Sequence, residues 1–369
     1  MKIRKMIKTA LLAITLLVLL FFIYSILPRV RHHKSTYGVP LEKADVLPAN
    51  FKHELNTYIT DTASFAQTLV AMQGEKVIFE TGDTQKLINC HSARKSVMSL
   101  LIGIAKEKGL LRLDETLAEL GIDESETPLT AQEKTATIRD LLLARSGVYL
   151  PAEAETDFAK KNRPKREQYK PGEFFFYNNF DFNVLGSILE QRTGLSIGEF
   201  MEENLARPLG MQDFAASNVV YGNTWPVPNR TTSNYPVYYI FLSARDLARI
   251  GVMVGQNGKW DDQQVLSPAW IAESTRIYNS FPDGQSWGIY DDYSYLWWLE
   301  FDHQTIWADG FGGQFLLIDP AHQITISQRN FTGNSLLSSG LYLAAKDNQG
   351  NPRDVIHVHE RIKKTIFGE

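Results

Sequence analysis

The stretch that decides the fold is NCHSARKSVMSLLIGIAKEKG, residues 89–109, which combines a possible nucleophile with a long apolar pattern. Apolar residues recur at helical spacing and stop before Gly109; they are Val97, Met98, Leu101, Ile102, Ile104 and Ala105. This spacing, followed by a glycine, predicts a buried helix from about Ser92 to Lys108. If the helix begins near Ser92, the side chains of Ser92 and Lys95 share one face of its first turn.

The pair Ser92 and Lys95 is a candidate nucleophile and base. A serine hydroxyl attacks a carbonyl well only when a neighbouring base accepts its proton. A lysine can be that base if burial or nearby positive charge lowers its pKa, and the N-terminus of a helix disfavours a protonated lysine. A capping serine with a solvated lysine fits the same pattern, so a second signal is needed. His91 and Cys90 are interpreted as bystanders, because consecutive residues do not face each other and lone cysteines are commonly buried.

The second signal is KPGEFFFYNNFDFNVLGSILEQRTG, residues 170–194. Its tripeptide Tyr-Asn-Asn at 177–179 follows a Pro-Gly turn and precedes an apolar helical pattern. A tyrosine and an asparagine two apart in a loop can reach one site, the phenol as a proton shuttle and the amide as a donor. We therefore select Tyr177 and Asn179, and set aside the similar tripeptide at 221–223, which lacks this context.

Composition limits the classes of partner. The chain has 369 residues, 44% hydrophobic and 22% charged, with a formal net charge of -4. No long basic run follows the first residues, so we expect no nucleic-acid partner and favour a small-molecule or peptide substrate. The single cysteine and the histidine spacing predict no metal site, and no cofactor is implied. His357 and His359 point different ways on a helix, so they are interpreted as surface residues.

The N-terminus predicts a membrane anchor. Residues 1–8 are basic, and residues 9–27 form an apolar run of 19 residues without a charge. That length spans a bilayer, whereas a cleaved signal peptide has a shorter apolar stretch and a small-residue cleavage site. We interpret the run as an uncleaved single-pass anchor in a bacterial inner membrane. The basic residues before it favour a cytoplasmic N-terminus, which places the remaining chain in the periplasm or outside the cell.

The order of the expected elements predicts an α+β fold. Residues 28–50 are polar and proline-punctuated, as in a linker, and residues 51–369 are expected to form a single globular domain. A hairpin is expected at 68–82 and a mostly helical region at about 110–275. Short β-type runs and a final helix follow, at 294–301, 313–320, 323–330 and 354–367. This order predicts an antiparallel sheet built from both chain ends, flanked by helices, with a mostly helical inserted region.

Six motifs in this order carry a resemblance to a known family. They are Ser92-x-x-Lys95, IRDLLLARSG (138–147), PGEFFFYNN (171–179), ARPLGMQDF (206–214), SARDLARIG (243–251) and ADGFGGQ (308–314). Each is moderately specific, but their order and spacing resemble the serine β-lactamase and penicillin-binding-protein-like family over about residues 51–330. The class C and esterase-like branch is the most similar.

This resemblance implies a mechanism and a set of residues. Ser92 would be the nucleophile, Lys95 its partner and Tyr177 the general base, with Asn179 contacting the substrate or Lys95. Attack of the serine on a carbonyl would give a tetrahedral intermediate, then an acyl-enzyme that water hydrolyses. The backbone N–H groups of Ser92 and Phe311 would bind the oxyanion. Gly310 would permit close approach of the backbone to a ligand.

One motif departs from the family pattern. The best-known members carry Lys-Thr-Gly or His-x-Gly on the inner strand, and the matching triplet here is Ala-Asp-Gly at 308–310. With Ala308 at the cationic position, an anionic substrate loses its partner, so esters, amides or small peptides of lower charge are favoured over β-lactams. The aromatic residues of 290–298 are expected to divide between the core and an acyl pocket.

An alternative from another class is a non-catalytic penicillin-binding-like protein that binds or senses cell-wall fragments or β-lactams. The presence of Ser92, Lys95 and Tyr177 together favours the enzyme, because a degenerate binding protein is expected to have lost at least one of them.

Overall fold

The structure is a computed structural model, and it describes residues 2–28, 30–31, 35–61, 66–222, 231–281, 288–300, 302, 304–344 and 350–369. Its helices, in order, are α1 (Lys2–Ile26), α2 (Ala49–Asp61), α3 (Arg94–Glu107), α4 (Ile138–Leu142), α5 (Asp157–Asn162), α6 (Asn179–Thr193), α7 (Ile197–Met201), α8 (Ala244–Gly255), α9 (Pro268–Ser274), α10 (Leu336–Ala344) and α11 (Pro352–Phe367). Short helical turns are η1 (His91–Ala93), η2 (Glu133–Thr135), η3 (Glu202–Ala206) and η4 (Ala216–Asn218).

Within the described residues, the main sheet has eight strands in the order β2-β1-β13-β12-β11-β10-β9-β8. Their bounds are β1 (Thr68–Gln73), β2 (Lys76–Thr81), β8 (Asn279–Ser280), β9 (Asp292–Tyr293), β10 (Trp298–Glu300), β11 (Thr305–Gly310), β12 (Gln314–Asp319) and β13 (Ile324–Arg329). Strand β1 pairs antiparallel with β13, from Thr68 opposite Arg329 to Gln73 opposite Ile324. The sheet is therefore built from both ends of the chain, which confirms the predicted α+β architecture.

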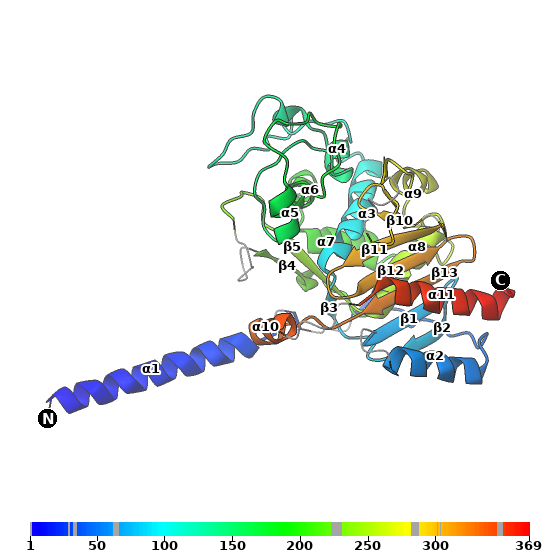
Figure 1. Ribbon diagram of the computed structural model, residues 1–369, viewed down its shortest axis with the longest axis horizontal. Helices are drawn as coiled ribbons and strands as arrows, with labels where there is room; N and C mark the ends of the chain where they lie inside the picture. Colours follow the sequence, from blue (N-terminus) through cyan, green and yellow to red (C-terminus); the bar gives the residue numbers. More distant parts are fainter. Residues whose placement is uncertain are drawn as a thin grey trace.

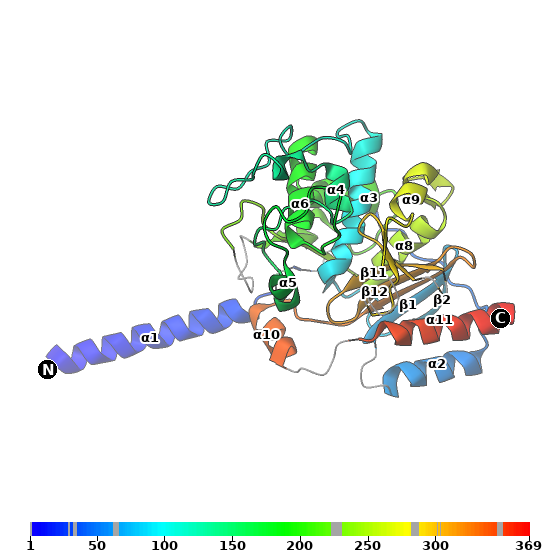
Figure 2. The same cartoon turned by 45° about the horizontal axis from the view of Figure 1, so that its top comes forward.

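Helices cover both faces of this sheet. Helix α8 packs on one face so closely that a Cβ atom on Gly251 would lie 2.6 Å from Thr325 and 2.8 Å from Leu316. Helices α11 and α2 lie together on the other face (Figures 1 and 2). Arg361 of α11 bonds Glu54 of α2 at 3.3 Å. A glycine on α8 is what allows the helix axis to approach the strands.

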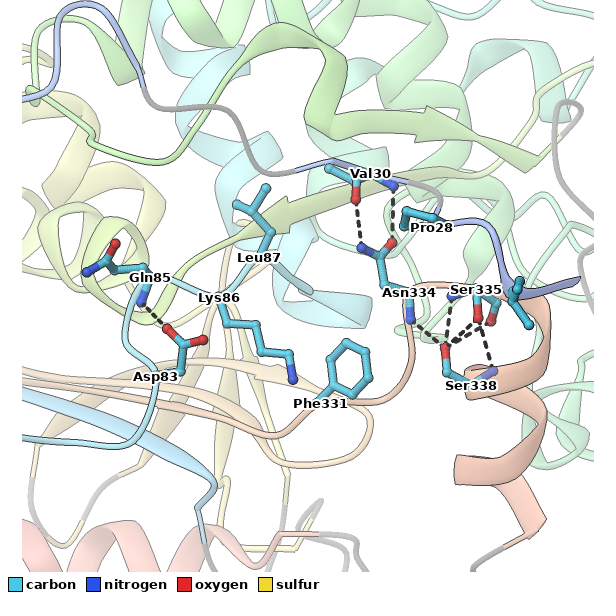
Figure 3. Close-up of a pocket in the computed structure, with 11 residues that line it drawn as sticks. Pro28, Val30, Asp83, Gln85, Lys86, Leu87, Phe331, Asn334, Ser335 and Ser338 are labelled. Carbon is cyan, nitrogen blue, oxygen red and sulfur yellow. Dashed lines mark hydrogen bonds between the residues drawn. The ribbon is translucent and has the colours of Figure 1, made fainter. Parts of the chain in front are cut away.

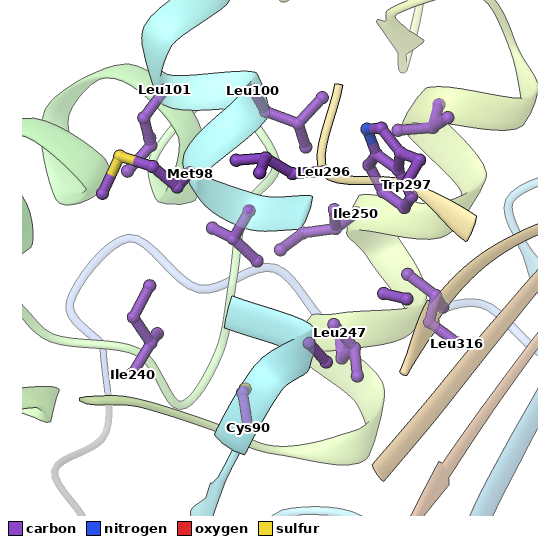
Figure 4. Close-up of a cluster of buried hydrophobic side chains, with 14 of the residues drawn as sticks. Cys90, Met98, Leu100, Leu101, Ile240, Leu247, Ile250, Leu296, Trp297 and Leu316 are labelled. Carbon is purple, nitrogen blue, oxygen red and sulfur yellow. The ribbon is translucent and has the colours of Figure 1, made fainter. Parts of the chain in front are cut away.

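The core continues around α3, which runs between the sheet and the helical region. Its residues from Arg94 to Ala105 are all buried. Figure 4 shows Met98, Leu100 and Leu101 of this helix among side chains from other elements, including Ile250 of α8 and Leu316 of β12. The helix that follows the candidate nucleophile is therefore buried on all sides, as its apolar pattern predicts.

One expectation from the sequence was wrong, and one was incomplete. Helices predominate in the region 110–275, as expected, but it also contains short strands: β5 (Tyr238–Leu242) pairs with β4 (Val219–Tyr221) and with β3 (Ile88–Asn89), and β6 (Lys259–Trp260) pairs with β7 (Gln263–Gln264). All five residues of β5 are buried, and a short continuous apolar run does not distinguish a buried strand from a helix. His359 is not a surface residue: it is 0% exposed, and its Nε2 lies 2.8 Å from the Asp319 carboxylate.

Helix α1 extends away from the rest of the molecule (Figure 1). Its segment Met6–Ile26 is long and apolar enough to cross a membrane, and its most apolar stretch of 18 residues is fully exposed. After the helix, the chain is tied to the segment before α10. The Asn334 side chain donates to the Val30 carbonyl at 2.7 Å and accepts from the Val30 N–H at 3.1 Å. These bonds lie at the side of a cavity of about 510 Å³ (Figure 3).

Candidate active site

Ser92 lies in the η1 turn, immediately before α3. The α-helix begins at Arg94, so the serine stands at the N-terminal approach to the helix, close to where the sequence predicts it. His91 has a positive φ of 47°, and its N–H donates to the Asn89 side chain at 2.9 Å. The His91 ring bonds the Thr332 hydroxyl at 2.7 Å instead of Ser92. Ser92 is therefore partly exposed in this turn, and the His91 ring is hydrogen-bonded to Thr332 and not to Ser92.

Lys95 joins the two other candidates. Its Nζ lies 2.9 Å from Ser92 Oγ and 2.7 Å from the Tyr177 hydroxyl. The side chain is only 3% exposed. Burial, followed by the positive charge of Arg94, lowers the pKa of Lys95 well below its usual value, while the Asp309 carboxylate acts in the opposite direction. The structure thus places Ser92, Lys95 and Tyr177 within hydrogen-bonding distance and favours a neutral amine between the two hydroxyls.

Tyr177 is held by a network at the start of α6. The Asn178 amide donates to the Val148 carbonyl at 2.6 Å and to the Asp181 carboxylate at 2.9 Å. The same carboxylate accepts from the Ser146 hydroxyl at 2.6 Å. Because the three side chains are buried and bonded to one another, they fix the backbone that carries Tyr177. The Pro-Gly turn was the sequence signal for this loop, but nothing in the sequence singled out Ser146 or Asp181.

The Tyr177 phenol is itself perturbed. Burial raises its pKa, although a hydrogen bond from Ser92 and the charge of Arg94 act against that rise. Its ring stacks on Trp298 with centroids 5.5 Å apart and an interplanar angle of 26°. The neutral phenol is therefore the favoured form, and it can donate or relay a proton.

Asn179 lies beside Tyr177 but its amide points to another loop. The Asn179 Nδ2 donates to the Ala154 carbonyl at 2.5 Å and approaches that of Glu153 at 3.4 Å. The contact with substrate or with Lys95 that the resemblance implies stays a prediction.

The end of β11 lies against the η1 turn, which carries Ser92. A Cβ atom on Gly310 would fall 2.2 Å from the Cys90 carbonyl oxygen and 3.1 Å from the Ala93 nitrogen. Only a glycine permits that approach. The next residue, Phe311, is 42% exposed, and its ring contacts the His91 ring at 5.5 Å between centroids. The predicted oxyanion donors, the N–H groups of Ser92 and Phe311, therefore belong to two segments in direct contact.

The aromatic residues of 290–298 do not divide between the core and an acyl pocket, as the sequence led us to expect. All five of these residues are buried: Tyr290, Tyr293, Tyr295, Trp297 and Trp298. Trp298 nevertheless packs on Tyr177, and Tyr290 stacks on Trp298 at 5.2 Å between centroids. The Tyr290 hydroxyl donates to Asp309 Oδ2 at 2.9 Å. The cluster is thus the packed wall behind Tyr177.

Two charged residues near the site were missed from the sequence. Arg94 is 3% exposed, with its Nη1 donating to the His91 carbonyl at 3.1 Å and its guanidinium above the Tyr238 ring at 5.0 Å. Burial raises the pKa of Asp309 to about 6, although the Tyr290 hydrogen bond and the Lys95 charge lower it. No local pattern indicates either role, because both depend on which segments meet in the fold.

A serine, a lysine and a tyrosine joined by hydrogen bonds, at the start of a buried helix beside an antiparallel sheet, are the arrangement typical of the β-lactamase-fold serine hydrolases. The sequence model of the beta-lactamase family matches residues 66–333, and the chain belongs to that family.

The individual relatives are distant. A D-aminopeptidase from Brucella anthropi is 35% identical over 66 residues, which is 18% of this chain and 12% of the relative. Protein flp from Staphylococcus aureus strain MW2 is 25% identical over 131 residues, which is 33% of this chain and 26% of the relative. The alignments therefore span about an eighth and about a quarter of these curated relatives.

Solved structures show the same fold. A structure described as a 6-aminohexanoate-dimer hydrolase from Bacillus anthracis has a TM-score of 0.62 at 16% identity, covering 94% of this chain and 95% of its own. A penicillin-binding protein homologue from Caulobacter crescentus has a TM-score of 0.59 at 16% identity, covering 88% of this chain and 99% of its own. At this level of identity the likeness concerns the fold alone.

Proposed function

We propose that the protein is a membrane-anchored serine hydrolase that cleaves an ester, an amide or a small peptide through an acyl-enzyme. The observation that carries the proposal is the position of Lys95 Nζ, 2.9 Å from Ser92 Oγ and 2.7 Å from the Tyr177 hydroxyl. The similarity of a short segment to a D-aminopeptidase, an enzyme named for peptide cleavage, supports an amide or peptide substrate.

In the proposed acylation, neutral Lys95 accepts the Ser92 proton while Oγ attacks the carbonyl carbon. The family resemblance assigns the base to Tyr177, but the raised pKa of that phenol and the lowered pKa of Lys95 favour the lysine. Tyr177 then relays the proton to the leaving group, and the bond from the carbonyl carbon to that group breaks. The N–H groups of Ser92 and Phe311 bind the oxyanion.

Deacylation reverses these roles. A water molecule gives its proton to Lys95 and attacks the acyl carbon, and Ser92 regains a proton as the ester bond to Oγ breaks. Each step returns Lys95 and Tyr177 to their starting protonation states, so the residues act as a catalyst. The buried Asn178–Asp181 network keeps the phenol in place throughout.

The inner strand argues against anionic substrates. Ala308 offers no cation, and the charged residue of that triplet is the carboxylate of Asp309. Esters, amides and small peptides without a carboxylate at this position are therefore proposed in preference to β-lactams.

We place the protein in a bacterial inner membrane, with α1 as a single-pass anchor and the site in the periplasm or outside the cell. The long apolar segment Met6–Ile26 and the basic residues before it support this proposal. The two hydrogen bonds between Val30 and Asn334 tie the end of the anchor to the domain.

A fluorophosphonate probe and p-nitrophenyl butyrate test the proposed chemistry. The full chain in detergent is compared with Ser92→Ala and with Ser99→Ala, a matched control on the adjoining helix α3 whose buried hydroxyl has no hydrogen-bond partner among the described residues. Labelling and turnover lost only in Ser92→Ala support the hydrolase. A folded wild-type protein that neither labels nor turns over substrate would favour the binding or sensing alternative.

A further inference from the structure

The carboxylate of Asp309 occupies a place beside the site that the proposed mechanism does not use. Asp309 lies on β11, immediately before Gly310, whose backbone presses on the turn that carries Ser92. Its charge also raises the pKa values of Lys95 and Tyr177, so it acts electrostatically on both residues. Contacts also connect Asp309 to the reacting groups: it bonds Tyr290, Tyr290 stacks on Trp298, and Trp298 stacks on Tyr177.

Within the described residues, only one of the two carboxylate oxygens of Asp309 accepts a hydrogen bond. Oδ2 accepts a hydrogen bond from the Tyr290 hydroxyl at 2.9 Å, and Tyr290 in turn stacks on Trp298. Among the described residues, no hydrogen bond or ion pair to Oδ1 is found, and Asp309 is only partly buried. Tyr290 therefore fixes the orientation of the carboxylate and leaves the other oxygen available for a ligand.

Covalent spacing limits how far a ligand group at Asp309 can lie from the reacting carbonyl. The oxyanion donor Phe311 is two residues further along the chain, in the turn that follows β11. Two residues span at most about 7 Å between their Cα atoms. A ligand group bonded to Asp309 can therefore belong to the same small substrate as the carbonyl attacked by Ser92, as an α- or β-amino group does in an aminoacyl compound.

We propose that Asp309 binds a positively charged ammonium group of the substrate, so that the preferred substrates are esters, amides or peptides of amino acids with a free amine close to the scissile carbonyl. This inference rests on the proposed hydrolase function and names its substrate class. An ammonium group donates to a carboxylate through a charge-assisted hydrogen bond, which is stronger than a neutral one. The same carboxylate repels the anionic substrates that a lysine at Ala308 would have attracted.

A pair of substrates of nearly equal size tests the inference. Alanine p-nitroanilide carries an ammonium group, and lactic acid p-nitroanilide carries a hydroxyl at the same carbon; both enantiomers of each are used. Full-length wild type, Asp309→Asn and Tyr290→Phe are compared by kcat/KM. Asp309→Asn removes the charge and keeps an acceptor for Tyr290, whereas Tyr290→Phe keeps the charge and removes the donor.

We expect wild type to prefer the cationic substrate by about tenfold, the scale of one charge-assisted hydrogen bond. Asp309→Asn should abolish this preference, so that the ratio of the two kcat/KM values falls to near one whatever its effect on the neutral substrate, and Tyr290→Phe should keep the preference. A ratio near one in wild type, or an unchanged ratio in Asp309→Asn, overturns the inference. Equal losses on both substrates in both variants would mean that Asp309 only supports the aromatic wall.

Binding without turnover separates this inference from the proposed chemistry. Calorimetric titration of Ser92→Ala with alanyl-alanine amide and with its lactoyl analogue does not require a nucleophile. Tighter binding of the cationic ligand, lost on adding Asp309→Asn, supports the inference even if the wild type proves inactive. If the wild type is not labelled by the fluorophosphonate but the binding preference persists, the proposed hydrolase activity is rejected. The inference that Asp309 binds a cationic ligand then still stands.

Discussion

Gly310 of β11 and Cys90 before the nucleophile turn are in backbone contact, and a Cβ atom on Gly310 would lie 2.2 Å from the Cys90 carbonyl oxygen. Neither atom belongs to a flexible side chain, so the contact cannot relax without moving the strand or the turn. One proposed oxyanion donor, Phe311, directly follows the strand, and the other, Ser92, lies in the turn. The absence of a side chain on Gly310 therefore sets the distance between the segments that hold the two donors.

Gly310→Ala should consequently reduce both stability and activity. Forcing a methyl group against backbone in a packed interior costs about 1–3 kcal/mol of unfolding free energy. Because the displaced segments carry Ser92 and Phe311, we expect kcat/KM for p-nitrophenyl butyrate to fall by about 100-fold or more, the scale of losing one oxyanion donor. Urea unfolding and ester kinetics measure the two effects.

Gly340→Ala is the matched control for this experiment. A Cβ atom there would meet no atom of the described residues within 4 Å, and the residue lies in α10. Its stability should change by less than about 1 kcal/mol. Full activity in a folded Gly310→Ala variant would show that the approach of β11 to the turn does not matter for the reaction.

The charge of Arg94 should set the pH dependence of the reaction. Lys95 must be neutral to accept a proton, so kcat/KM falls as the pH drops through its pKa. Arg94 lowers that pKa, hence Arg94→Met should raise it and move the acid limb of the pH–rate profile to higher pH. The profile is measured with a neutral ester, so that only the enzyme titrates.

Lys106→Met is the control for that shift, because Lys106 lies on the same helix, is partly exposed and pairs with Glu273 at 3.6 Å. Its acid limb should coincide with that of wild type. If the limb of folded Arg94→Met also stays in place, Lys95 is not the group whose ionisation limits the reaction.

Asp319 should stabilise the fold in a pH-dependent manner. Burial acts to raise its pKa, but hydrogen bonds from His359 and His322 prevail and lower it to about 2. An Asp with a depressed folded-state pKa stabilises the protein above its unfolded pKa, and this contribution disappears as the pH falls towards about 2. A shift of this size corresponds to about 2 kcal/mol at neutral pH.

Asp319→Asn should therefore lower the unfolding free energy at pH 7 and flatten its decline between about pH 4 and pH 2. Asp114→Asn, at a carboxylate whose side chain is 80% exposed, is the control and should leave the curve unchanged. Chemical unfolding at several pH values measures both. Parallel curves for wild type and Asp319→Asn would contradict the proposed role of the two histidines.

Helix α1 should hold the protein in the membrane. We expect the full chain to remain in the membrane fraction after alkaline carbonate washing, and a chain beginning at Ser35 to be released. Leu16→Arg combined with Leu17→Arg places two charges in the span, each costing about 2.5–3.5 kcal/mol at its centre, and should weaken insertion. Protease added to spheroplasts should digest the domain; protection of the domain would reverse the proposed orientation.

Much of the site was predictable because its motifs are local. Ser92 and Lys95 are three residues apart, in the η1 turn and the first turn of α3, and Tyr177 is marked by a turn before another helix. The hairpin β1–β2 and the last helix followed from the spacing of apolar residues. Strand β5 and the burial of His359 did not follow, because an apolar run and a lone histidine acquire their roles only from the elements that pack on them.

The sequence by itself determined the apolar helices, the membrane-length N-terminal segment and the family motifs, since periodicity and spacing are properties of consecutive residues. Only the tertiary structure decided that Lys95 lies between Ser92 and Tyr177, and that Asp309 holds an available oxygen beside them. The physical reason is that hydrogen bonds and pKa shifts depend on distance and burial, and both are set when segments far apart in the chain come into contact.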